Sequence, residues 1–94
     1  MIRRLILSPD ARVDLTLAIR WYQHKEVSLA LRFRAEATMT LLRIARNPYQ
    51  FRVIDGELRR ALMTRFPYSV YFTLKRDNIF VIAVRHQHSL MPVR

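Results

Sequence analysis

Hydrophobic positions recur at helical spacing in two long stretches of the chain. Ser8-Pro9-Asp10 opens the first, with a capping serine, a proline suited to the first helical position and an acid that favours the helix N-terminus. We therefore predict a helix that begins after Ser8 and fades near His24-Lys25. Its buried side is expected to consist of Ala11, Leu15, Ala18, Ile19 and Tyr22.

The second stretch predicts a helix from Ser28 to Asn47-Pro48, because the residue before a proline is pushed out of helical dihedrals. A short connection should pack the two helices as an antiparallel hairpin. We expect Trp21, Tyr22 and Phe33 to lie in the core. The apolar stripe of the second helix comprises Ala30, Phe33, Ala37, Leu41 and Ile44, and the outward positions are Arg32, Arg34, Glu36, Arg43 and Arg46.

Strands are predicted near the N-terminus and in the last third of the chain. Residues 2–7 form a short apolar strand, and residues 58–66 alternate between two faces until Pro67 makes a corner. Residues 68–74 and 79–84 are rich in aromatic and β-branched side chains. The second of these strands has no polar face, which places it near the middle of the sheet.

Two connections complete this prediction. Residues 49–57 are expected to be a loop that turns at Gly56, the only glycine, and residues 75–78 a hairpin turn. The order is β-α-α-β-β-β, which favours an α+β fold in one domain spanning residues 1–94. A chain of 94 residues with 51% hydrophobic content is long enough for one modest core.

The charge favours an acidic partner. The net charge is +10, and all but two of the 17 basic residues are arginines, which bind carboxylate and phosphate as a planar fork. Residues 1–57 carry ten basic and six acidic groups, or +4, and residues 58–94 carry seven and one, or +6. No apolar run approaches the roughly 20 residues that span a bilayer, and no signal peptide is evident, so we expect a cytoplasmic protein.

Several chemistries are poorly supported by the residue types. One glycine cannot build a phosphate-binding glycine loop, and the absence of cysteine excludes a thiolate nucleophile. Of the three histidines, His86 and His88 would point to opposite faces if the strand continued, and no carboxylate lies near these two in the sequence, so a metal site is poorly supported. We therefore expect neither a cofactor nor a metal.

The remaining candidates are basic residues in the last third of the chain. As a functional site they would neutralise phosphate, with arginine stabilising charge and histidine moving a proton. As ordinary surface groups, arginines on strands would protect sheet edges and keep the protein soluble. The candidate residues are Arg59, Arg60, Arg65, Arg85, His86 and His88.

The order of these segments resembles the RelE/ParE superfamily of toxins from bacterial toxin–antitoxin modules, most closely its ParE-like, plasmid-stabilisation branch. The resemblance rests on LSPDARVDLTLAIRWY, LRFRAEATMTLLRIARNP, RRALMTRFPYSVYF and IFVIAVRH, which cover nearly the whole chain. It implies a helical hairpin packed on a mostly antiparallel sheet, with the first strand beside the last. It also implies a cognate antitoxin, for which both helices and residues 58–66 offer docking surfaces.

The superfamily implies two alternative activities. ParE-like members block DNA gyrase by binding, whereas RelE-like members cut messenger RNA on the ribosome. The family often continues after the final histidine with arginine, proline and an aromatic residue, but this chain has Gln87-His88-Ser89, and no aromatic follows Phe80. We therefore favour gyrase inhibition without catalysis. The alternatives are an mRNA endonuclease and a non-toxic binding module. The endonuclease would use Arg59, Arg60, Arg65, Arg85 and His86.

Overall fold

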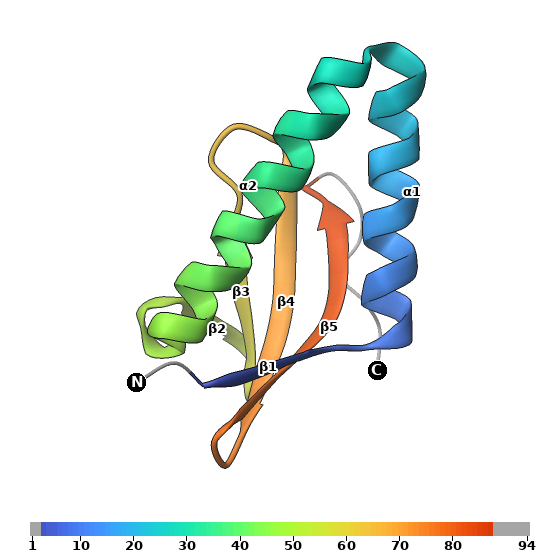
Figure 1. Cartoon of the computed structure of the whole chain (residues 1–94). Coiled ribbons are helices and arrows are strands. Elements are labelled where there is room, and N and C mark those ends of the chain that lie inside the picture. Colours follow the sequence, from blue (N-terminus) through green and yellow to red (C-terminus); the bar gives the residue numbers. More distant parts are fainter. Residues whose placement is uncertain (1–2, 88–94) are drawn as a thin grey trace.

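Two helices form a hairpin over one face of a five-stranded sheet (Figure 1). The computed structural model describes residues 3–87. The strand order is β1-β5-β4-β3-β2, in which only β1 and β5 are parallel. The predicted α+β class and mostly antiparallel sheet are confirmed. The elements are β1 (Arg4–Leu7), α1 (Pro9–Lys25), α2 (Val27–Arg46), the 3₁₀-helix η1 (Pro48–Gln50), β2 (Arg52–Asp55), β3 (Leu58–Leu62), β4 (Tyr68–Lys75) and β5 (Asn78–His86).

The helices form as their sequence signals predict. The Ser8 hydroxyl accepts a hydrogen bond from the Ala11 N–H at 3.0 Å and so caps α1. Glu26 alone separates the helices; its extended backbone ends α1 and starts α2, which begins at Val27, one residue before the predicted Ser28. Between residues 3 and 87, no helix is long and apolar enough to span a bilayer.

The sheet contains one more strand than predicted. Residues 49–57 were expected to be a loop, but they include part of η1 and the edge strand β2, which pairs with β3 across a bulge. This prediction was wrong because four residues with no clear alternation give little periodic signal. β3 also ends at Leu62 rather than residue 66, since the chain leaves the ladder before the corner at Pro67.

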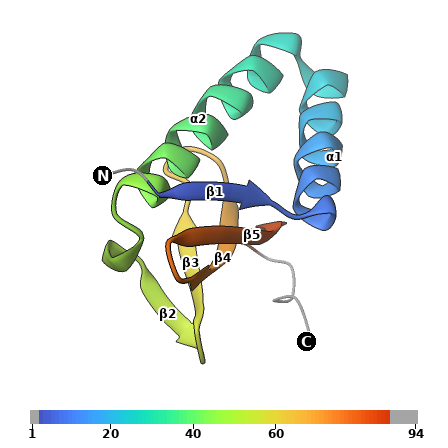
Figure 2. The ribbon, with the colours of Figure 1, turned by 60° about the horizontal axis from the view of Figure 1, so that its bottom comes forward.

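The strand without a polar face lies inside the sheet, as predicted. β5 pairs with β1 on one side and β4 on the other, and Figure 2 shows β1 beside it. Leu5 lies opposite Ile79, and Leu7 lies opposite Val81. The turn from β4 to β5 is formed by Arg76 and Asp77, shorter than predicted, and Arg76 has a φ of 58°.

The core lies between the helical hairpin and the sheet. Phe33 is fully buried, and its ring packs against the rings of Tyr22, Phe66 and Tyr68. The predicted apolar stripes of both helices are confirmed, with Leu15, Ile19 and Leu41 only partly buried. Two positions differ from the prediction. Trp21 is 54% exposed because it lies beside the buried stripe of α1, and the half-buried Glu36 accepts a hydrogen bond instead of pointing into solvent.

Candidate functional site

Helix α1 covers an open stretch of β5. β1 pairs with β5 only as far as Val81, so the rest of this edge has no neighbouring strand there. The Ser8 hydroxyl donates to the Ile82 carbonyl at 3.1 Å, and the Val84 N–H donates to Asp14 Oδ2 at 2.9 Å. Asp14 Oδ2 also lies 3.5 Å from Arg85 Nε. Polar groups of α1 therefore replace a strand along this edge.

Asp14→Ala is expected to destabilise the fold by about 1–3 kcal/mol, because it leaves the Val84 N–H without its acceptor. Asp14→Asn keeps a carbonyl oxygen that can accept the bond, so it should lose less stability. Urea unfolding measures the free energy of unfolding of both variants. Asp10→Ala, at an exposed acid in the first turn of the same helix, is the matched control. Equal stability of Asp14→Ala and Asp10→Ala would show that the bond to Val84 contributes little.

A groove of roughly 630 Å³ lies between α1 and the end of β5. The rings of Tyr68 and His86, which both line this groove, meet edge to face with centroids 5.3 Å apart. Arg85 and His86, consecutive residues of β5, both line this groove. The groove is lined by Asp14, Leu17, Ala18, Trp21, Tyr22, Pro67, Tyr68, Val84, Arg85 and His86.

Both tyrosines of this groove are held in the neutral form. Burial raises the pKa of Tyr22 above its usual value, and the neighbouring Tyr68 raises it further. Burial also raises the pKa of Tyr68. Neither phenol is therefore a base at neutral pH, although each hydroxyl can still donate a hydrogen bond.

The other predicted basic residues lie elsewhere. Arg59 belongs to the helix-covered face of the sheet, where it donates to the Phe51 carbonyl at 2.8 Å. Arg60 pairs with Tyr71 on the opposite face, because successive strand residues alternate. Arg65 lies in the β3–β4 connection, where its backbone N–H donates to Glu36 Oε2 at 2.7 Å.

Arg65 borders a second groove, of roughly 560 Å³, between α2 and the β3–β4 connection. Its walls are Leu29, Arg32, Ala35, Glu36, Met39, Thr64, Arg65 and Phe66. His88 lies outside the described residues. The proposed cluster is therefore distributed over both sheet faces and a connection, and only Arg85 and His86 share a groove.

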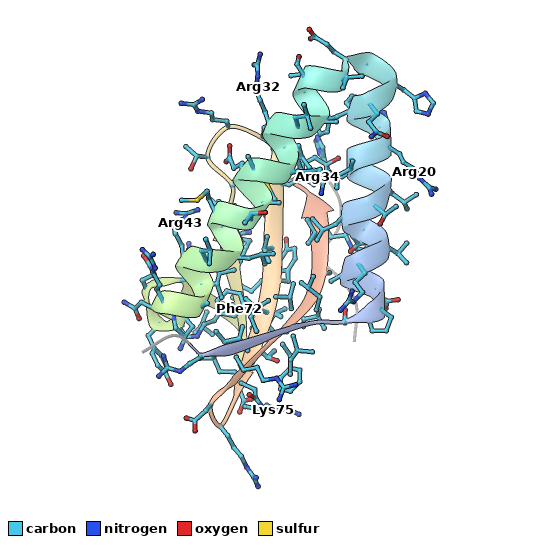
Figure 3. All side chains as sticks on the ribbon, viewed as in Figure 1. Arg20, Arg32, Arg34, Arg43, Phe72 and Lys75 are labelled. Carbon is cyan, nitrogen blue, oxygen red and sulfur yellow. The ribbon has the colours of Figure 1, made fainter. Side chains whose placement is uncertain are left out.

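Both helices of the hairpin carry large apolar side chains that are more than half exposed. On α1 they are Val13, Leu17 and Trp21, four residues apart and each 54–57% exposed. On α2, Leu31 and Met39 are 60% and 58% exposed. Arginines lie on the same two helices, and Figure 3 shows Arg20 on α1 and Arg32 and Arg34 on α2. Trp21 was predicted to lie in the core, so its exposure was not anticipated.

Three polar residues of the α1–β5 groove were not among the candidates predicted from the sequence. Asp14, Tyr22 and Tyr68 became part of the site only through the pairing of β5 with its neighbours. Among residues 3–87, no group of three histidine, aspartate or glutamate side chains is arranged to hold a metal ion.

Comparison with known proteins identifies the class of this fold. A family profile described as ParE toxin of type II toxin–antitoxin system, parDE, matches residues 5–91. The chain therefore belongs to the ParE family of type II toxins. No curated protein matches the sequence significantly.

A solved structure is similar in fold. It is described as the chromosomal ParDE TA system from P. aeruginosa, and one of its chains superposes with a TM-score of 0.80 at 17% sequence identity. The match covers 90% of this chain and 96% of that chain. At this identity the likeness extends to the fold, including the helical hairpin and the sheet.

Proposed function

We propose that this protein inhibits DNA gyrase by binding and is silenced by an acidic antitoxin encoded beside it. Membership of the ParE family and the shared fold support this proposal. The target implies that the protein acts in the cytoplasm. Binding sites on the toxin are proposed at the α1–β5 groove, with Arg85 and His86, and at Arg59, Arg60 and Arg65; His88 belongs to the same proposal from sequence alone.

The observation that favours binding over catalysis is the separation of the candidate catalytic groups. An endonuclease needs its acid, base and cations around one phosphate, within hydrogen-bonding reach of the reacting atoms. Here Arg59 and Arg60 point to opposite faces of β3, and Arg65 contacts α2 through its backbone. Only Arg85 and His86 share a groove, where Arg85 already lies beside Asp14.

The helical hairpin supports an antitoxin partner. An amphipathic segment could cover the apolar side chains of α1 with its apolar face and meet the surrounding arginines with acidic residues. The net charge of +10 favours such a partner and would speed its association. We assign antitoxin docking to the outer surfaces of α1 and α2 and to the adjoining β3 region.

Purified protein is expected to inhibit the supercoiling of relaxed plasmid by gyrase, and the adjacent acidic gene product should restore it. A parallel reaction contains ribosomes and messenger RNA, which should stay intact. Cleaved messenger RNA that disappears with the double variant Arg60→Ala and Arg65→Ala would instead establish the endonuclease. Neither supercoiling inhibition nor cleavage, with the antitoxin still bound, would identify a non-toxic binding module.

A further inference from the structure

An exposed tyrosine lies beside basic side chains at the end of the sheet far from the α1–β5 groove. Tyr49, in η1, is 58% exposed. The guanidinium carbon of Arg3 lies 5.1 Å from the centre of its ring, and that of Arg59 lies 5.3 Å from it. Cations at this distance interact favourably with the ring and orient it.

The fold brings these residues together from distant parts of the chain. The Arg3 N–H donates to the Ala45 carbonyl at 3.2 Å, which holds the start of the chain beside the end of α2. Arg59 is the second residue of β3, and its hydrogen bond to the Phe51 carbonyl, directly after η1, fixes the side chain. Arg76, in the β4–β5 turn, shares with Tyr49 and Arg59 a hollow of roughly 300 Å³.

Basic side chains outnumber acidic ones at this site. One acid, Glu57, lines the hollow together with Arg59 and Arg76, and Arg3 adds a third guanidinium beside the Tyr49 ring. Arg43 and Arg46 lie nearby in the last turn of α2, where the helix C-terminus explains a preference for cations. That explanation does not extend to Arg3, Arg59 or Arg76, which lie outside the helix.

We propose that Tyr49, Arg3, Arg59 and Arg76 form a contact site for single-stranded nucleic acid. An exposed aromatic ring stacks on an unpaired base of any sequence, and flanking arginines bind the phosphates on either side. The hollow beside Tyr49 provides room for a nucleotide next to the ring. An acidic protein segment would find its apolar anchors on the helical hairpin instead, so the Tyr49 site fits nucleic acid better.

The test measures fluorescence anisotropy of labelled oligothymidylate of about ten nucleotides, a length typical of one such site. Tyr49→Ala should weaken binding by about tenfold, and Tyr49→Phe should not, because the phenyl ring still stacks. Arg3→Glu and Arg76→Glu should each weaken binding and lower the salt dependence by about one phosphate contact. Arg20→Glu makes the same charge change at an exposed site on α1 and should have a much smaller effect.

Three results would overturn the proposal. Equal losses of oligonucleotide affinity in Arg20→Glu and Arg76→Glu would mean that binding depends only on the overall positive charge of the protein. If the Tyr49→Ala variant bound the oligonucleotide with unchanged affinity, stacking on this ring would be excluded. Because Tyr49 is exposed, its replacement should leave the fold intact, so the test stays valid even if the Arg3→Glu variant unfolds. If polyglutamate bound more tightly than the oligonucleotide, and Tyr49→Ala weakened that binding, the site would instead bind acidic polypeptides. The assay contains no gyrase or antitoxin, so it can fail independently of the proposed function.

Discussion

Phe33→Ala is expected to lower the free energy of unfolding by about 3–5 kcal/mol, the cost of removing a large aromatic side chain from a packed core. Phe33 is fully buried, with ring centroids 5.3 Å from Tyr22, 5.3 Å from Phe66 and 5.1 Å from Tyr68. Those three rings come from α1, the β3–β4 connection and β4. The substitution therefore leaves a cavity where three separate elements meet.

Urea unfolding followed by circular dichroism measures this loss. Leu31→Ala is the matched control, since Leu31 lies on the same helix but is 60% exposed, and such surface changes usually stay within about 0.5 kcal/mol. Phe33→Leu refills much of the volume and should fall between the two. Equal losses from Phe33→Ala and Leu31→Ala would mean that the aromatic cluster does not hold the hairpin to the sheet. Because the total free energy of unfolding of a typical domain is about 5–15 kcal/mol, the Phe33→Ala variant should also have a measurable unfolded fraction in mild denaturant.

Trp21→Ala is expected to weaken binding of the proposed antitoxin by about 30-fold, or about 2 kcal/mol, the threshold for a hot-spot residue. Trp21 is 54% exposed, yet two contacts hold its ring in place. The centre of the Tyr22 ring lies 5.0 Å from the centre of the Trp21 ring, and the Lys25 ammonium lies 4.9 Å from it. A large ring that is already oriented loses little conformational freedom when a partner covers it. Trp21 also borders the α1–β5 groove, so one partner segment could contact both.

Calorimetric titration with the proposed antitoxin measures the affinity. Tyr49→Ala removes an equally exposed aromatic ring at the other end of the sheet, and the antitoxin affinity should be unchanged. The unfolding midpoint of Trp21→Ala should stay close to that of the unsubstituted protein, which separates a lost contact from a lost fold. If Tyr49→Ala weakened antitoxin binding more than Trp21→Ala, the antitoxin would dock away from the helical hairpin.

The elements with strong periodic or capping signals were predictable from the sequence. Ser8-Pro9 marks the start of α1, Asn47-Pro48 marks the end of α2, and the apolar run of β5 indicates an interior strand. β2 was not predictable in the same way, because it is a four-residue edge strand that depends on β3 for its pairing. The assignment of Trp21 to the core was avoidable, since a residue next to Tyr22 turns about 100° away from it on a helix.

The site was less predictable because it depends on which strands are neighbours. A group of arginines close in sequence suggests one cluster, but the pleat of β3 sends Arg59 and Arg60 to opposite faces. Asp14 gains its role only because β1 stops short of Val84 and leaves that N–H to α1. The Tyr49 site likewise depends on the hydrogen bond that holds Arg3 beside the end of α2.

The pairing of β1 with β5 also affects how the protein is made. Leu5 and Ile79 are direct partners although 74 positions separate them, so β1 has no strand to pair with until nearly all the described chain has been synthesised. Contacts this distant in sequence slow folding, because a long loop must close before they form. The helical hairpin, whose contacts are local, can form earlier while its sheet-facing side is still uncovered. During synthesis, the nascent chain therefore exposes its apolar helices before it has a complete toxin fold.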